Sequence, residues 1–436
     1  MPFNPIPGTD LPERIDGGDQ RDLITAAGGD DTLGGWGNDD RIYGEDGNDN
    51  LWGSYGSDSL YGGEGNDTVT GAEYDHGDID HIHGGAGDDA LFTGEVVNYS
   101  YGGTGNDTVT LYFDVGGAAQ GGAGDDFLVM NYIGSSLGTG GDTDVSVTLN
   151  IGATSGTQTM TLSGFERLWI TTYMGDDTVT GGNRDDHINV HTGANSVQAL
   201  GGDDVVIVMS GEANDLDGGM GQDTLTITAW EDLNGLALTV TGTSATDDAG
   251  SVMAGFEQWL INGSYLADTV TLGDGDDGLL GRAGADVAQG MGGSDRLVGN
   301  TGADSLDGVA GRDVLIGGRN LDQLTGGEGA DSFVFDRRAG SGDVITDFAS
   351  GEDRLRISDR MVGGALPAGG VADSDFHLDT AIGTGGQFVY RMTGETGQGA
   401  LVWDANGIDA GSEFVVALLD GMPALTAADL MITLFD

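Results

Sequence analysis

Apolar residues recur along much of this chain at a fixed interval of nine positions, each two residues after an aspartate. Between Asp268 and Asp331 the aspartates keep this interval without interruption, and Val270 and Leu279 are examples of their apolar partners. Glycines precede most of the aspartates, so the unit reads Gly-Gly-x-Gly-x-Asp-x-Φ-x, where Φ is apolar. Such a repeat predicts a solenoid, because one unit is too short to bury its apolar residue without neighbours.

Each unit predicts a tight loop followed by a short strand. The glycines permit positive φ in the loop, and the three residues around Φ form a parallel ladder with their neighbours. Two units make one turn, so aspartates two units apart lie above one another. We therefore expect an all-β fold, a parallel β-roll or β-helix solenoid. A disordered glycine-rich linker is the alternative, but disorder would not keep Φ in phase with the aspartate.

Interruptions of the repeat predict the domain organisation. The repeat is absent from two stretches in which polar and apolar residues alternate, which is typical of longer strands. Both stretches contain Gly-Phe-Glu, at Gly164 and Gly255, which indicates an internal duplication. We expect a leader at 1–13, rolls at 14–130, 176–225 and 266–333, β inserts at 131–175 and 226–265, and a β-sandwich-like C-terminal cap at 334–436.

The loop aspartates are the candidate metal ligands. Carboxylate and main-chain carbonyl oxygens in a flexible loop suit a hard cation of calcium's size. A lone aspartate in a turn often only caps its own loop, but the phase with glycine favours ligation. Asp22 lacks the third glycine and Asp268 lacks a glycine loop, so both are left out. The candidates are Asp31, Asp40, Asp49, Asp58, Asp67, Asp89, Asp107, Asp126, Asp177, Asp186, Asp204, Asp223, Asp277, Asp286, Asp295, Asp304, Asp313, Asp322 and Asp331.

The charge and composition of the chain limit the kinds of partner that it can bind. The formal net charge of −57 opposes a compact state unless cations neutralise it, and it argues against nucleic acid or anionic membranes as partners. The absence of cysteine excludes disulfides and thiolate metal sites. No apolar run reaches the length of a transmembrane helix, so we expect no transmembrane segment.

Three aromatic residues occupy the same outward slot in successive repeats: Tyr43, Trp52 and Tyr61. Tyr43 and Tyr61 should stack on one face, with Trp52 on the other. Such a row can bind a glycan, although aromatic residues also favour strands for packing alone. The pair His81 and His83 flanks an inward Ile82, which favours solvent-facing histidines over a transition-metal site.

The repeats resemble those of the RTX family, calcium-binding repeat proteins of Gram-negative bacteria, over residues 14–333 without the inserts. The C-terminal part resembles that of serralysin-type proteins in Gly329–Phe335, Asp343–Phe348, Leu401–Gly407 and Pro423–Asp429. This resemblance implies export by a type I (ABC) exporter and a place outside the cell or on its surface. The leader shows neither the basic region nor the apolar core of a signal peptide, which agrees with that route. The His-Glu-x-x-His motif of the serralysin protease domain is absent, so peptidase activity is not implied.

We therefore expect a secreted calcium-binding protein that folds on binding extracellular Ca²⁺. A non-catalytic role fits best, as a structural, surface-associated or adhesion protein that contacts cell-surface glycan or assembles with itself. The alternative is a calcium-dependent extracellular enzyme that acts on polysaccharide, with a site in the inserts.

Overall fold

The computed structural model describes residues 2–71, 78–93, 98–112, 117–131, 146–148, 160–172, 176–210, 212–229, 232, 234–336, 342–379, 386–393, 397–406 and 413–434. Most of the first predicted insert, 131–175, lies outside these ranges. The regular secondary structure of the described residues is almost entirely strand, and the described helices are the short 3₁₀ turns η2 (Asp373–Asp375) and η3 (Ala427–Asp429). None of the helices in these ranges has the length and apolarity needed to cross a bilayer.

The chain divides into two compact units. The first comprises Met1–Thr224 with Met253–Gly255, and the second comprises Leu225–Val252 with Phe256–Asp436. The division falls within β23 (Thr224–Thr228).

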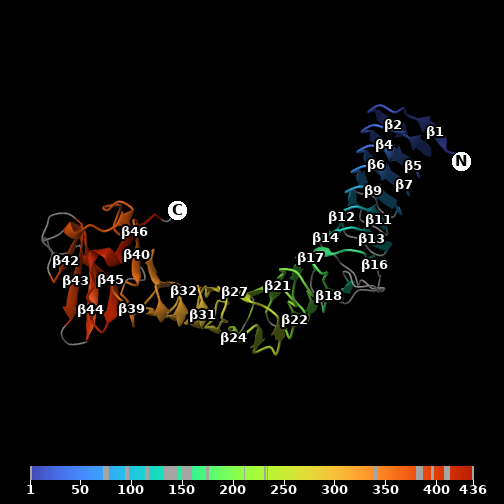
Figure 1. Ribbon diagram of the computed structural model, residues 1–436. Helices are drawn as coiled ribbons and strands as arrows, with labels where there is room; N and C mark the ends of the chain where they lie inside the picture. The colour runs from blue at the N-terminus through green and yellow to red at the C-terminus, as the bar shows by residue number, and fades with distance from the viewer. Residues whose placement is uncertain are drawn as a thin grey trace. The chain divides into compact units, whose positions relative to one another are not determined.

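The first unit is a parallel solenoid whose successive turns add strands to the same sheets (Figure 1). One sheet contains β1 (Asn4–Pro7), β3 (Asp22–Thr25), β5 (Arg41–Asp46), β7 (Ser59–Glu64), β9 (His81–Ala86), β11 (Asn98–Thr104), β13 (Gly117–Ala123) and β16 (Met160–Ser163). The second contains β2 (Arg14–Gly18), β4 (Thr32–Gly37), β6 (Asn50–Tyr55), β8 (Thr68–Thr70), β10 (Ala90–Phe92), β12 (Thr108–Tyr112), β14 (Phe127–Asn131), β17 (Arg167–Thr171), β19 (His187–Val190) and β21 (Val205–Met209). A third ladder contains β18 (Thr178–Thr180), β20 (Ser196–Gln198) and β22 (Asp215–Asp217), with β15 (Ser146–Thr148) antiparallel to β18. β26 (Val252–Ala254) also belongs to this unit.

The Φ residues form the core, as the repeat predicts. Ile24 pairs with Ile42, and Ile42 with Leu60, in successive strands of one sheet. All three side chains are fully buried. Burial of such a side chain contributes about 1.5–3 kcal/mol, and no single unit could supply it alone.

The second unit repeats this design. One ladder contains β27 (Gln258–Asn262), β29 (Gly278–Leu280), β32 (Arg296–Thr301), β35 (Val314–Arg319), β38 (Ser332–Phe335), β40 (Arg354–Ser358) and β46 (Leu430–Thr433). The other contains β24 (Ala237–Thr241), β28 (Thr269–Thr271), β30 (Val287–Gln289), β33 (Ser305–Asp307), β36 (Gln323–Thr325) and β39 (Asp343–Ile345). The loops pair through β31 (Gly292–Gly293), β34 (Ala310–Gly311) and β37 (Glu328–Gly329). β25 (Ser244–Asp247) is antiparallel to β24.

The C-terminal region continues both ladders. β46 completes the first of them, and β41 (Gly369–Gly370) pairs with it in the antiparallel sense. Beside β39 lies β45 (Glu413–Asp420), followed by antiparallel β44 (Gln398–Asp404) and β43 (Gln387–Thr393), and then β42 (Phe376–Leu378). The buried Trp403 and Phe388 pack in this part, with ring centroids 4.8 Å apart.

Both predicted inserts contribute strands to the solenoid. In the first, β17 pairs in parallel with β14 and β19, so its residues form an ordinary layer of the stack. In the second, β27 pairs in parallel with β29. The repeat is hidden in these layers because Leu168 and Trp259 stand at the aspartate position, two residues before the buried Ile170 and Ile261.

Candidate metal-binding sites

The loop aspartates form buried columns along each solenoid. At most steps of a column the main-chain N–H of one aspartate donates to Oδ1 of the aspartate one turn later, and at a few steps the acceptor is an asparagine, as in the bond from Asp177 to Asn195. Asp22 donates in this way to Asp40 at 2.7 Å, and Asp277 to Asp295 at 2.9 Å. Each column is therefore a chain of hydrogen bonds that fixes one carboxylate oxygen and leaves the other to the loop.

The second oxygen has no hydrogen-bond partner in most of these loops. Among the described residues, this holds for buried Oδ2 atoms of Asp31, Asp40, Asp49, Asp58, Asp67, Asp89, Asp107, Asp126, Asp204, Asp286, Asp295, Asp304, Asp313, Asp322 and Asp331. A buried carboxylate oxygen without a partner costs free energy, about 1–3 kcal/mol or more. A set of such atoms in one structure indicates a ligand that they bind.

Most of the unpartnered oxygens lie in a cradle beside a glycine five residues earlier in the chain, where a side chain would not fit; in the loops of Asp31 and Asp204 this residue is Ala26 and Ala199. A Cβ on Gly290 would contact Asp295 Oδ2 and, at 2.9 Å, the carbonyl oxygen of Gly308 in the next turn. A Cβ on Gly44 would likewise contact Asp49 Oδ2 and the carbonyl oxygen of Gly62. Carboxylate and carbonyl oxygens thus converge where a side chain would otherwise be, and this donor set suits Ca²⁺.

Burial makes the unpaired carboxylates weak acids. It raises the pKa of Asp58 to about 9, with the charges of Asp80 and Asp40 adding to the effect. It raises the pKa of Asp295 to about 8 and that of Asp286 to about 7. A cation in the cradle would favour the ionised form, because an opposite charge nearby lowers a carboxyl pKa.

Asn195 shows which charge these loops favour. It occupies an aspartate position, and its Nδ2 donates to the carbonyl oxygens of His191 at 3.0 Å and Gly193 at 3.1 Å. Its Oδ1 keeps the column bond by accepting from the N–H of Asp177. An amide nitrogen, which carries positive partial charge, therefore lies where the loop carbonyls point.

The predicted ligands all lie in these columns, but Asp186 and Asp277 differ from the set above. Oδ2 of Asp186 accepts a hydrogen bond from Gly182 N–H at 2.6 Å. Oδ2 of Asp277 accepts one from Gly273 N–H at 2.9 Å. The role of every predicted ligand stays a prediction.

The sequence pattern missed several members of the columns. The column bond of Asp322 goes to Asp343, and that of Asp331 to Asp353, in the C-terminal region. The main-chain N–H of Asp126 donates to Glu166 Oε2 at 2.7 Å. The steps to Asp343 and Asp353 are 21 and 22 residues instead of 18, so the fixed interval could not find them.

Side chains alone do not make these sites. Within the described residues, no three His, Asp or Glu side chains gather closely enough to hold a metal ion. A cation in a cradle would take other ligands from main-chain carbonyl oxygens, such as Gly308 O beside Asp295, and such a donor set suits calcium better than a transition metal.

The predicted aromatic stacking is confirmed. Tyr43 and Tyr61 stack with ring centroids 4.8 Å apart, and Tyr61 stacks on His83 at 4.7 Å. Trp52 lies on β6 in the other sheet. Ile82 is fully buried as predicted, and His81 is exposed beside it.

Seven segments of the chain match the family model of the RTX calcium-binding nonapeptide repeat (4 copies): 7–42, 43–73, 76–99, 171–206, 261–288, 289–323 and 307–337. They include loops from both units. None of these segments extends past residue 337, so the serralysin-type C-terminal resemblance stays a prediction.

Other comparisons give weaker likeness. No curated protein matches the chain. The solution structure of the AlgE6R3 subunit from the Azotobacter vinelandii mannuronan C5-epimerase is 26% identical, and the match covers 38% of this chain and 78% of that one with a TM-score of 0.21. The crystal structure of extracellular lipase LipA from Serratia marcescens is 16% identical, and the match covers 65% of this chain and 41% of that one with a TM-score of 0.18. Neither likeness supports a conclusion about activity.

Proposed function

We propose that this chain, whose repeats are of the RTX calcium-binding type, is a secreted protein that folds when Ca²⁺ occupies its loops. Its role outside the cell is structural, surface-associated or adhesive, and not catalytic. The observation that carries the proposal is the series of buried carboxylate oxygens without partners, most of them beside a carbonyl oxygen of the next turn.

Calcium and folding are coupled through charge. With a net charge of −57, the acidic side chains repel one another in any compact state, and the loop aspartates place part of that charge in the interior. A cation in each cradle offsets this repulsion, so the free energy of binding becomes free energy of folding. Extracellular calcium modules bind at about 10⁻⁴–10⁻³ M. Sites of that affinity stay empty inside a cell and fill outside.

The secreted location and the type I exporter rest on the resemblance in sequence. An extended chain without bound calcium is suited to export. Its glycine-rich segments stay unfolded until the metal binds, because ordering them costs much conformational entropy. The partner outside is a cell-surface glycan or a second copy of the chain.

The non-catalytic role has support from how the carboxylates are used. Most buried aspartates serve the columns, and in the second insert the Asp247 carboxylate accepts hydrogen bonds from Ser251 N–H and Oγ, both at 2.8 Å. Asp247 therefore stabilises a turn. An enzyme acting on polysaccharide remains the alternative, with its site in the inserts.

Sedimentation velocity tests the proposal, first with chelator and then with several millimolar calcium. We expect a slow, expanded species that calcium converts into a faster one, with a parallel gain of β signal in far-UV dichroism. Large ordered assemblies in calcium would support a coat or matrix role, and a compact monomer would direct the search to glycan partners. Equal β content with chelator and with calcium would refute the proposal.

A further inference from the structure

The aspartate loops are of two kinds, which we call open and closed. In an open loop the aspartate Oδ2 accepts no hydrogen bond, as described above for Asp295. In a closed loop Oδ2 accepts a hydrogen bond from the main-chain N–H four residues earlier. Asp277 and Asp295 are consecutive members of one column, so the two kinds lie one turn apart in the same environment.

Five described loops are closed. Their aspartates are as buried as those of the open loops. The Oδ1 atom of each also accepts a hydrogen bond, in four of the five loops from a main-chain N–H and in Asp22 from the side chain of Asn4. The closing bonds are Gly18 to Asp22 at 2.8 Å, Gly182 to Asp186 at 2.6 Å, Ser264 to Asp268 at 2.8 Å, Gly273 to Asp277 at 2.9 Å and Ala349 to Asp353 at 2.7 Å.

One backbone angle separates the two kinds. In every open loop the residue four positions before the aspartate has positive φ: Ala27, Trp36, Glu45, Ser54, Gly63, Gly85, Gly103, Gly122, Leu200, Arg282, Met291, Asn300, Val309, Gly318 and Gly327. In the five closed loops the corresponding residue does not, although three of the five are glycine. The left-handed conformation therefore goes with loss of the closing bond. Ser54 illustrates this, because its N–H donates to Gly71 O in the next turn instead of to Asp58.

An open loop is unfavourable without a ligand for two independent reasons. Its buried carboxylate oxygen has no hydrogen-bond partner. In most open loops the left-handed residue also carries a Cβ, which makes positive φ strained. Val309, with φ of 73°, is the extreme case because it is β-branched. A closed loop has neither cost, since a main-chain N–H takes the position next to Oδ2.

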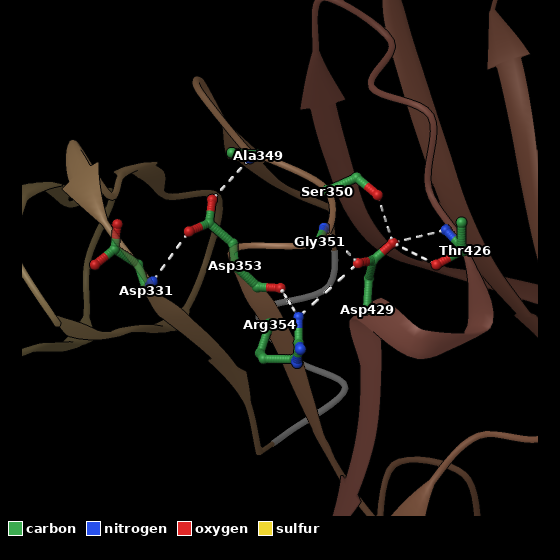
Figure 2. Close-up of polar contacts among 8 residues, drawn as sticks. All are labelled: Asp331, Ala349, Ser350, Gly351, Asp353, Arg354, Thr426 and Asp429. Carbon is green, nitrogen blue, oxygen red and sulfur yellow. Dashed lines mark hydrogen bonds and ion pairs between the residues drawn. The ribbon is translucent and has the colours of Figure 1, made fainter.

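The closed loops lie at the ends of the columns. Asp22 is the first loop aspartate of the first roll. Asp268 and Asp277 are the first members of the two columns in the last roll. Asp353 is the last member, where its Oδ1 accepts from Asp331 and its Oδ2 from Ala349 (Figure 2). Asp186 lies next to β17, and its Oδ1 accepts from Leu168 N–H.

We infer that calcium binds only at the open loops and that the closed loops are metal-free end layers, in which a main-chain N–H replaces the cation. This inference rests on the proposed calcium function. It assigns different roles to two residues of the same type at the same place in the repeat, and Asp186 and Asp277 then stabilise the fold without ligating metal.

The test compares Asp277→Asn with Asp295→Asn in the full chain, counting bound calcium by equilibrium dialysis at saturating calcium. We expect Asp295→Asn to bind at least one ion fewer than the unchanged chain and Asp277→Asn to bind the same number. Equal losses in both variants would overturn the inference. An unchanged chain that binds no calcium would instead overturn the proposed function.

A second pair and a second measurement guard against a variant that fails to fold. Asp22→Asn and Asp40→Asn repeat the comparison in the first unit, where Asp22 donates to Asp40. Anomalous scattering from calcium in crystals of the unchanged chain needs no variant. We expect peaks beside Asp286, Asp295, Asp304 and Asp313 and none beside Asp268, Asp277 or Asp353, and a peak beside Asp277 would contradict the inference.

Discussion

Asn195 Nδ2 donates a hydrogen bond to the carbonyl oxygen of His191, 3.0 Å away. In this loop one asparagine supplies both the column acceptor and a positive partial charge for the carbonyls. The buried oxygen atoms of the loops thus find a partner of positive charge, full or partial, in three ways. The partner is a side-chain amide here, a main-chain N–H in the closed loops and, by our proposal, a cation in the open loops.

Asn195→Asp should destabilise the fold by about 1–3 kcal/mol, because a buried carboxylate would face two carbonyl oxygens without a donor. His191 does not have positive φ, so we expect no additional calcium ion. Urea unfolding at fixed millimolar calcium, with a parallel count of bound ions, measures both quantities. Unchanged stability together with one extra ion would show that this loop converts into a site.

Gly290→Ala should crowd the loop of Asp295, which has no room for a Cβ at this position. The added methyl would contact Asp295 Oδ2 and lie 2.9 Å from Gly308 O, so the loop must shift. We expect a loss of about 1–3 kcal/mol in the free energy of unfolding in calcium, as for other overpacked buried positions, and a higher calcium midpoint for folding. Gly292→Ala is the matched control in the same loop, since its nearest contact is Asp274 Oδ1 at 3.4 Å and its φ is not positive. Similar losses in both variants would argue against a specific cradle.

The calcium requirement should depend on pH. Burial raises the pKa of Asp295 to about 8, of Asp286 to about 7 and of Asp331 to about 6, all above the unfolded value near 3.8. A raised folded pKa contributes stability that is complete below about pH 4 and is lost as the pH rises through about 6 to 8. In chelator, lowering the pH from 8 to 5 should therefore increase the β signal in far-UV dichroism.

Protons and calcium compete for the same carboxylates. In the same pH range the calcium concentration that half-saturates the loops, measured by equilibrium dialysis, should rise as the pH falls from 8 to 6, because binding requires the ionised form. A midpoint that does not change over this range would contradict ligation by these aspartates.

The stacked rings should contribute stability more than recognition. Tyr61 lies between Tyr43 and His83, so both of its ring faces are covered and a sugar cannot stack on them. Tyr61→Ser removes two stacked pairs, each worth about 0.5–1.5 kcal/mol, and should lower the urea midpoint without changing glycan binding. Trp52→Ser, at a ring that is 38% exposed on the other sheet, should cost less stability. Loss of glycan binding in Tyr61→Ser alone would restore the carbohydrate hypothesis for this row.

The sequence interval predicted the solenoid, its core and its aspartate columns because these follow from a strict repeat. Ile24, Ile42 and Leu60 are stacked as their spacing requires. The interval could not predict the continuation into Asp343 and Asp353, since loops of other lengths intervene and only the three-dimensional register brings these carboxylates under Asp322 and Asp331.

Propensity alone gives the wrong expectation for the two kinds of loop. Glycine is the residue that favours positive φ, yet Gly18 and Gly273 do not adopt it, whereas Trp36 and Val309 do. The conformation is imposed by the stacking of each loop on the next, as in the bond from Ser54 N–H to Gly71 O. Only the folded stack reveals which loops are open.

The stability of β46 in the C-terminal region should depend on the buried carboxylate of Asp429. Burial acts to raise the pKa of Asp429, but hydrogen bonds from Ser350, Thr426 and Gly351 outweigh it and the pKa lies below its usual value (Figure 2). Asp429 directly precedes β46, the strand that completes one ladder. Asp429→Asn weakens hydrogen bonds to a charged acceptor, so we expect a loss of about 1.5–3 kcal/mol and faster hydrogen exchange in β46.

The sign of the pH dependence distinguishes this contact from the columns. A lowered folded pKa contributes stability that is present above about pH 4 and is lost as the pH falls through the folded value, which is opposite to the effect of Asp295. Hydrogen exchange of β46 in saturating calcium should therefore accelerate below pH 4 in the unchanged chain, and the Asp429→Asn variant should show this acceleration less. Asp373→Asn, at an exposed position in η2, is the control and should leave the exchange unchanged. Equal exchange in all three proteins would show that Asp429 does not hold β46 in place.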